Sequence, residues 1–184
     1  SGMSPKQITV EKIKKQGYQK MPLLGWLPVT VPGAVGAWAE LSEKYGKLPF
    51  ETLLQPAISY AKEGFPVTPT IARLWEKSFQ VYSKECKETV FDEWFRIFAP
   101  KGRAPFAGEL WNAPYHAKTL EELAQTKCSS FYKGVLADKI DNFSKTTGGY
   151  LTKEDLKNYV PEWVEPISIN YKGYDIWEIP PNGH

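Results

Sequence analysis

The side chains that most often carry chemistry are few in this chain and stand apart. Cys86 and Cys128 have neither a Cys-x-x-Cys spacing nor a histidine beside them, so we interpret both as ordinary thiols. No motif places a carboxylate or a nucleophile next to His116 or His184, and neither is predicted to be a catalytic base. We therefore assign no catalytic, cofactor-binding or metal-binding residue within 1–184, and expect no cofactor.

Composition and charge indicate which classes of partner the chain is suited to bind. A chain of 184 residues with 42% hydrophobic content is long enough for one domain with a core. Its net charge of +2 gives no strong field for nucleic acid, and no run of about 18 apolar residues would span a membrane. We expect no nucleic-acid or membrane partner.

Aromatic residues make up 14% of the chain and include 7 Trp. They could form a carbohydrate- or peptide-binding face, or fill a core between helices. Without a repeat or an aromatic ladder, we favour the core.

Helical signals dominate the first half of the chain. A short helix is predicted over Thr9 to Gln16, closed by Gly17, and a longer one after Gly33 that ends at Gly46. The apolar positions between Phe50 and Ala61 would share one helix face. Pro56, however, lacks an N–H and would clash with the carbonyl of Thr52. We therefore predict two short helices, the second starting at Pro56 and capped by Gly64.

The second half continues with helices and ends in strands. Thr68 and Pro69 start a helix, and a further turn or two covers Phe91 to Phe98 before the irregular stretch Ala99 to Pro114. The remaining predicted elements are a helix around Ala117 to Ala124, one helix from Ser129 or Ser130 to the stop at Gly148 and Gly149, a short helix opened by a Thr152–Asp155 capping box, and a hairpin turning at Lys172 and Gly173.

Large apolar residues at helical spacing give the predicted core. Its members are Trp38, Leu41, Leu54, Ile58, Leu74, Trp75, Leu120, Leu136 and Ile140.

The order of these segments resembles one family, the large-subunit region of γ-glutamyltransferases and the related cephalosporin-acylase-like hydrolases. The stretches that carry the likeness are "VTVPGAVGAWAELSEKYGKLPFETLLQPAISYAKEGFPV" (Val29–Val67), "AKTLEELA" (Ala117–Ala124), "FYKGVLADKI" (Phe131–Ile140), "GGYLTKEDLKNY" (Gly148–Tyr159) and "PISINYKGYDIWEIPPNGH" (Pro166–His184). Together they cover most of the chain in the family's order.

The resemblance implies a proenzyme that cleaves itself to expose an N-terminal threonine, within a four-layer αββα fold of the N-terminal-nucleophile hydrolases. The nucleophile and the substrate-binding positions would lie beyond His184. Residues 1–184 are then a partial large-subunit region, mainly helical with a C-terminal β-hairpin. Its partners would be the remainder of its own large subunit, the small subunit, and a γ-glutamyl or related amide substrate.

The chain departs from the family pattern near its start. Glutathione-cleaving members bring an Arg from just before this first segment to clasp the substrate's α-carboxylate, whereas this chain has Gly2, Met3, Ser4 and Pro5. We expect no such clamp from these four residues, unless a residue upstream of Ser1 provides it. The Asn182–Gly183 pair also favours the acylase-like group. The Gly-Arg-Ala-Pro at Gly102–Pro105 stands in another context and receives no such role.

Two alternatives stay open: a non-catalytic member of the same family that serves binding or structure, and an independent helical binding domain. Because a globular domain rarely stops at a Pro-Pro-Asn-Gly turn, we expect the chain to continue.

Overall fold

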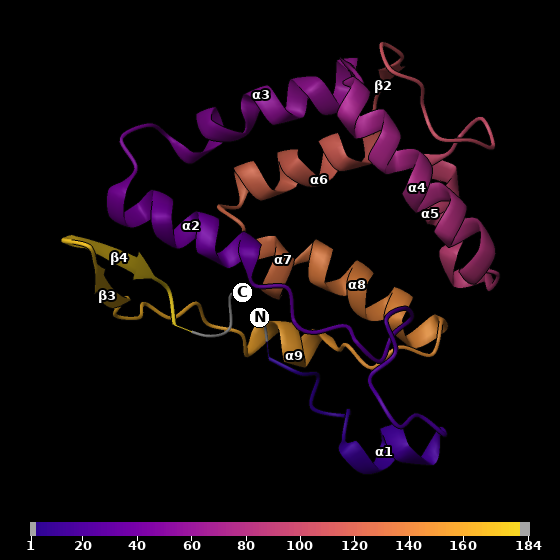
Figure 1. Ribbon diagram of the computed structural model, residues 1–184, viewed down its shortest axis with the longest axis horizontal. Helices are drawn as coiled ribbons and strands as arrows, with labels where there is room; N and C mark the ends of the chain where they lie inside the picture. Colours follow the sequence, from indigo (N-terminus) through magenta and orange to yellow (C-terminus); the bar gives the residue numbers. More distant parts are fainter. Residues whose placement is uncertain (1–2, 181–184) are drawn as a thin grey trace. The chain divides into compact units, whose positions relative to one another are not determined.

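The computed structural model describes residues 3–180 and divides into two compact units. Unit 2 is the continuous segment Gly46–Ser130. Unit 1 combines the two flanking segments, Ser1–Tyr45 and Phe131–His184, within their described residues. Helices dominate both units (Figure 1), as the sequence predicts.

Helices of unit 1 come from both of its segments. They are α1 (Val10–Lys15), α2 (Ala34–Tyr45), α8 (Val135–Thr146) and α9 (Lys153–Lys157), followed by strands β3 (Ile167–Tyr171) and β4 (Tyr174–Glu178). Unit 2 holds α3 (Phe50–Glu63), β1 (Phe65–Pro66), α4 (Pro69–Glu85), the 3₁₀ turn η1 (Thr89–Phe91), α5 (Asp92–Phe98), β2 (Leu110–Trp111) and α6 (Pro114–Gln125). Helix α7 (Ser129–Lys133) contains the boundary between the units.

The hydroxyl of Tyr132 ties the start of α2 into unit 1. It donates to the carbonyl of Pro32 at 2.8 Å and accepts from the backbone N–H of Gly36 at 2.9 Å. Tyr159 stacks on Tyr132 with ring centroids 5.3 Å apart. A Cβ at Gly33 would lie 2.5 Å from the Tyr159 hydroxyl oxygen, so this close approach requires glycine.

The expected single helix from Ser129 or Ser130 to Gly148 is wrong, because Gly134 divides it into α7 and α8. Gly134 is extended, with φ −120° and ψ −151°, and precedes the first residue of α8. Apart from proline, glycine is the residue with the lowest helix propensity. The predicted stop is confirmed: α8 ends at Thr146, just before Gly148 with φ +75°.

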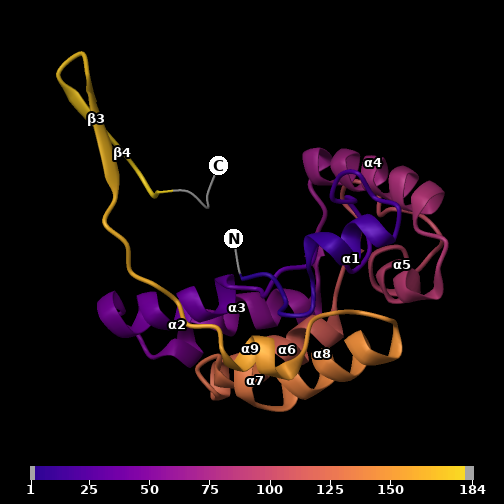
Figure 2. The same ribbon diagram turned by 90° about the horizontal axis from the view of Figure 1, so that it is seen from below.

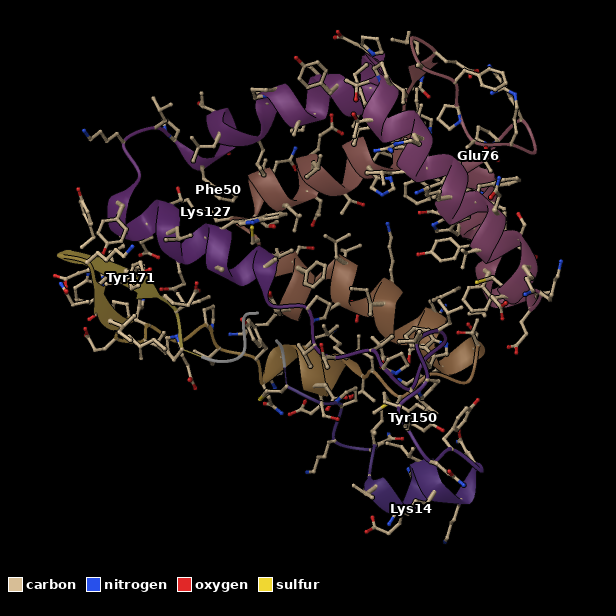
Figure 3. All side chains as sticks on the ribbon, in the orientation of Figure 1. Lys14, Phe50, Glu76, Lys127, Tyr150 and Tyr171 are labelled. Carbon is tan, nitrogen blue, oxygen red and sulfur yellow. The ribbon has the colours of Figure 1, made fainter. Side chains whose placement is uncertain are left out.

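Asp155 fastens the N-terminal segment to α9. Its carboxylate accepts from the backbone N–H of Lys6 and of Thr152, both at 2.9 Å, which confirms the capping box. Burial opposes ionisation, but the hydrogen bonds from Thr152 and Lys6 hold the pKa of this carboxyl below its ordinary value. Farther along, the amide of Gln16, the residue after α1, donates to the hydroxyl of Tyr150. Tyr150 is labelled in Figure 3.

The predicted break at Pro56 is wrong, since α3 runs unbroken from Phe50 to Glu63. Phe50 and Ile58 are buried on it and Leu54 is half-buried, and α3 lies beside α6 (Figure 1). A proline inside a helix costs about 3 kcal/mol, and burial of each large apolar side chain returns about 1.5–3 kcal/mol. One continuous packed face therefore outweighs the lost hydrogen bond.

The predicted core is right in part. Ile58 and Leu136 are buried, and Leu54, Trp75, Leu120 and Ile140 are half-buried. Trp38, Leu41 and Leu74 are 44–51% exposed, contrary to the prediction. Helical spacing identifies an apolar face but not whether a neighbouring element covers it.

The predicted hairpin is confirmed, and its turn has φ +51° at Lys172 and +84° at Gly173, as a two-residue primed turn requires. Pairing of Ile169 with Ile176 and of Tyr171 with Tyr174 gathers apolar side chains on one side. We call this side the apolar hairpin face: Ile167, Ile169, Tyr171, Tyr174 and Ile176, which are 53–78% exposed. Glu178, opposite Ile167, lies at the end of this side. Figure 2 shows the hairpin at the end of an extended segment that follows α9.

Replacing Tyr132 by Phe should destabilise the chain by about 1–3 kcal/mol, because the buried N–H of Gly36 loses its acceptor. Urea unfolding followed by circular dichroism measures the change. Tyr45→Phe, at an exposed tyrosine of the same unit, is the control and should change the midpoint little. Equal midpoints for the two variants would show that the Tyr132 hydroxyl is not needed.

Candidate functional site

The residues that the sequence singled out for chemistry are not assembled into a reactive group. Cys86 and Cys128 are free and buried, and burial raises the pKa of the Cys128 thiol to about 11. His116 is exposed in the first turns of α6 with its ring against Phe98, at 5.7 Å between centroids. His184 lies outside the described residues.

Residues 3–180 also hold no cluster of three or more His, Cys, Asp or Glu side chains that could bind a metal. None of the helices in this range is long and apolar enough to cross a bilayer.

Glu109 organises the irregular loop before α6. Its carboxylate accepts from Arg103 Nη1 at 2.8 Å and from the backbone N–H of Phe106 at 2.9 Å, and it pairs with Lys101. Arg103, then Lys101 and the Phe106 amide, lower the pKa of Glu109 to about 2. The carboxylate is therefore ionised and hydrogen-bonded at neutral pH. Such a group holds the loop together, and we call it the Glu109 staple; it is not suited to act as a general acid.

Just after this staple, β2 pairs with β1, a two-residue antiparallel contact that the sequence did not predict. The pairing places Trp111 opposite Phe65. Trp111 Nε1 donates to the Ile97 carbonyl at 3.2 Å, and its ring stacks on Phe98 with an interplanar angle of 15°. The aromatic residues of unit 2 thus pack on one another, as expected for core rings.

A pocket of about 600 Å³ opens on unit 2 where α3, α6 and the β1–β2 pair meet. We call it the α3–α6 pocket; its lining residues are Ala57, Tyr60, Ala61, Phe65, Pro66, Trp111, Ala113 and His116. None of these side chains is acidic, or is a lysine or arginine. The lining offers ring and van der Waals contacts but no carboxylate to partner His116, so it is suited to binding and not to acid–base chemistry.

Sequence reasoning missed this pocket. The available signal was the pair of small residues Ala57 and Ala61, one turn apart on α3, where larger side chains would fill the space. That spacing alone is too common to identify a site.

Comparison with known proteins identifies the family. The whole chain, residues 1–184, matches the family model described as gamma-glutamyltranspeptidase. It is 35% identical to the glutathione hydrolase-like YwrD proenzyme of Bacillus subtilis over 183 residues, which are 99% of this chain and 33% of that protein. The chain belongs to the γ-glutamyltranspeptidase family.

Solved structures agree with this assignment. The cephalosporin acylase from Bacillus halodurans is 55% identical, with a TM-score of 0.96 over 99% of this chain and 34% of that chain. The γ-glutamyltranspeptidase of Helicobacter pylori is 28% identical, with a TM-score of 0.86 over 99% of this chain and 52% of that chain. The likeness to both γ-glutamyltransferases and cephalosporin-acylase-like proteins is confirmed, and the chain spans about a third of the length of the curated relative above.

Replacing Glu109 by Gln should flatten the acid dependence of stability. Because the folded-state pKa, about 2, lies below the ordinary value of 4.5, ionised Glu109 contributes stability that is present above pH 4.5 and lost as pH falls toward 2. Urea midpoints measured across this range should fall more steeply in the parent chain than in Glu109→Gln. The exposed Glu51→Gln is the control for loss of one charge, and parallel curves for Glu109→Gln and the parent would contradict the staple.

Proposed function

We propose that residues 1–184 are the scaffold portion of the large subunit of an autoprocessed γ-glutamyltransferase, glutathione hydrolase or acylase-like amidase. The observation that carries this proposal is the alignment of 99% of the chain with only 34% of a cephalosporin acylase at a TM-score of 0.96. The relative named a glutathione hydrolase-like proenzyme supports an autoprocessed parent.

In this proposal the nucleophile is an N-terminal threonine of the small subunit, outside this segment. Such a residue carries its own base, because its free α-amine can take the proton of the adjacent hydroxyl. Attack on a γ-glutamyl or related amide would form an acyl-enzyme, which water or an acceptor amine resolves. Backbone N–H groups would stabilise the oxyanion. Residues 1–184 would position elements around that centre together with the rest of the large subunit and the small subunit.

We further propose that the hairpin becomes part of the central sheet in a four-layer αββα fold. Strand β4 carries apolar groups on both sides, with Ile176 on one and Trp177 on the other. Strands that are apolar on both sides are typical of sheets covered on both faces. Within residues 3–180 the apolar hairpin face is exposed, which supports the proposal that another part of the parent protein covers it.

Within the described residues, Met3 does not supply a clamp for the α-carboxylate of a substrate. The backbone carbonyl of Met3 accepts a hydrogen bond from the N–H of Val31 at 2.8 Å. The residue is 48% exposed. Its thioether cannot form the paired charge-assisted hydrogen bonds that an arginine gives a carboxylate. Gly2 lies outside the described residues.

The proposal is tested with the intact parent protein and with residues 1–184 alone. The parent should cleave itself into two chains and turn over p-nitroanilide amides, whereas residues 1–184 should show no turnover above a blank. Replacing the parent's new N-terminal threonine by alanine should abolish activity. An unprocessed, inactive parent would favour the non-catalytic alternative, and turnover by residues 1–184 would refute the placement of the nucleophile.

The same assay separates the substrate classes. γ-Glutamyl and 4-aminobutyryl anilides differ by the α-carboxylate alone, so their kcat/KM values should agree within about tenfold if no arginine clamps that group. A clamp of two charged hydrogen bonds would give a ratio of about a hundredfold or more.

The covered-strand proposal has its own test in residues 1–184. This segment should self-associate with rising concentration, and Ile176→Lys should reduce light scattering without loss of helix content, because it puts a charge on the apolar hairpin face. Ser168→Lys, on the opposite face, is the control. A monodisperse monomer over a hundredfold concentration range, with the hairpin as protected from amide exchange as the helices, would refute it.

A further inference from the structure

We propose that the α3–α6 pocket binds a small, uncharged aromatic molecule. The inference rests on the lining of the pocket within unit 2 and does not depend on the proposed amide chemistry.

Small side chains provide the space. Ala57 and Ala61 come from α3, and Ala113, which is only 2% exposed, immediately precedes α6. The volume of about 600 Å³ falls within the range of about 300–1,000 Å³ typical of small-molecule sites. A flat ring system can therefore lie against the alanines without displacing a side chain.

Aromatic side chains provide the walls and indicate the shape of the guest. Tyr60 meets Phe65 edge to face, with centroids 6.4 Å apart at 81°, and Phe65 meets Trp111 at 5.8 Å and 79°. His116 contributes a fourth ring to the lining. A planar aromatic guest can extend this edge-to-face series, a geometry worth about 0.5–1.5 kcal/mol per ring pair beyond the burial of area.

The lining of the pocket contains no carboxylate, lysine or arginine that would favour an ion. The neighbouring charged residues Lys62 and Glu121 pair with each other, from α3 to α6, and neither belongs to the lining. An ionic ligand would therefore lose hydration without a carboxylate, lysine or arginine in the lining to pair with it. The Tyr60 hydroxyl and the His116 ring are available in the lining to orient one neutral polar substituent.

Backbone contacts join the elements that line the pocket. Ala113 N–H donates to the Ala61 carbonyl at 2.8 Å, which joins the two sides of the pocket floor. A Cβ at Gly64 would lie 3.0 Å from the Trp111 carbonyl oxygen, so a larger residue at the end of α3 would crowd β2. Binding to such a preorganised site loses little free energy to ordering of the protein.

The test uses two fluorescent probes that share one ring system, the uncharged N-phenylnaphthylamine and the anionic anilinonaphthalene sulfonate. The chain should bind the uncharged probe at one site, at least tenfold more tightly than the sulfonate. Ala61→Phe, which fills the pocket, should weaken binding of the uncharged probe at least tenfold. Ala57→Phe also fills the pocket, but from an exposed position. It should weaken binding of the uncharged probe as well, and it replaces Ala61→Phe in the test if that variant disturbs folding.

Two controls make the result specific to this pocket. Ser59→Phe adds the same ring at an exposed α3 position outside the lining and should leave the affinity unchanged. Ile176→Lys disrupts the apolar hairpin face and should also leave the affinity for the uncharged probe unchanged. Equal affinities for the two probes, equal effects of Ala57→Phe and Ser59→Phe, or loss of binding in Ile176→Lys would each overturn the proposal.

Discussion

In unit 1, the attachment of the start of α2 depends on a single hydroxyl group. Tyr132 Oη is donor to Pro32 and acceptor for Gly36, so one side chain satisfies two backbone groups at the start of α2. A buried backbone group without a partner is unfavourable by about 1–3 kcal/mol, which makes this double role hard to replace. The break at Gly134 and the stacking of Tyr159 both lie beside this contact. The Pro-Gly-Ala-Val-Gly stretch, residues 32–36, therefore both starts α2 and provides the surface on which Tyr132 and Tyr159 pack.

Much of the local structure could be read from the sequence, because its causes are local. Thr68 accepts from the N–H of Ile71, Thr152 and Asp155 cap each other, and Lys172–Gly173 forms the hairpin turn. Each of these features depends on residues within four positions of one another. The helix stop after Gly148 belongs to the same class.

The errors arose where distant residues decide the outcome. Pro56 breaks a helix by local rules, but α6 packs along α3 and favours one continuous element. Leu41 and Leu74 have the spacing of core residues, yet the described residues leave them 51% and 48% exposed. The α3–α6 pocket has the same origin, since Ala61 and Trp111 are brought together by the β1–β2 pair and not by a motif. The family could be recognised from sequence because that likeness rests on the order of many segments.

The interrupted course of unit 1 has a consequence for synthesis on the ribosome. The N–H of Gly36 cannot form its hydrogen bond until Tyr132 has been synthesised, 96 residues later. Every residue of the continuous unit 2 has been synthesised by then. Vectorial synthesis therefore gives unit 2 the opportunity to fold first. Once ordered, residues 46–130 no longer form a flexible loop, and less chain entropy is lost when the two segments of unit 1 meet. Folding of the inserted unit would therefore shorten the flexible loop that assembly of unit 1 has to close.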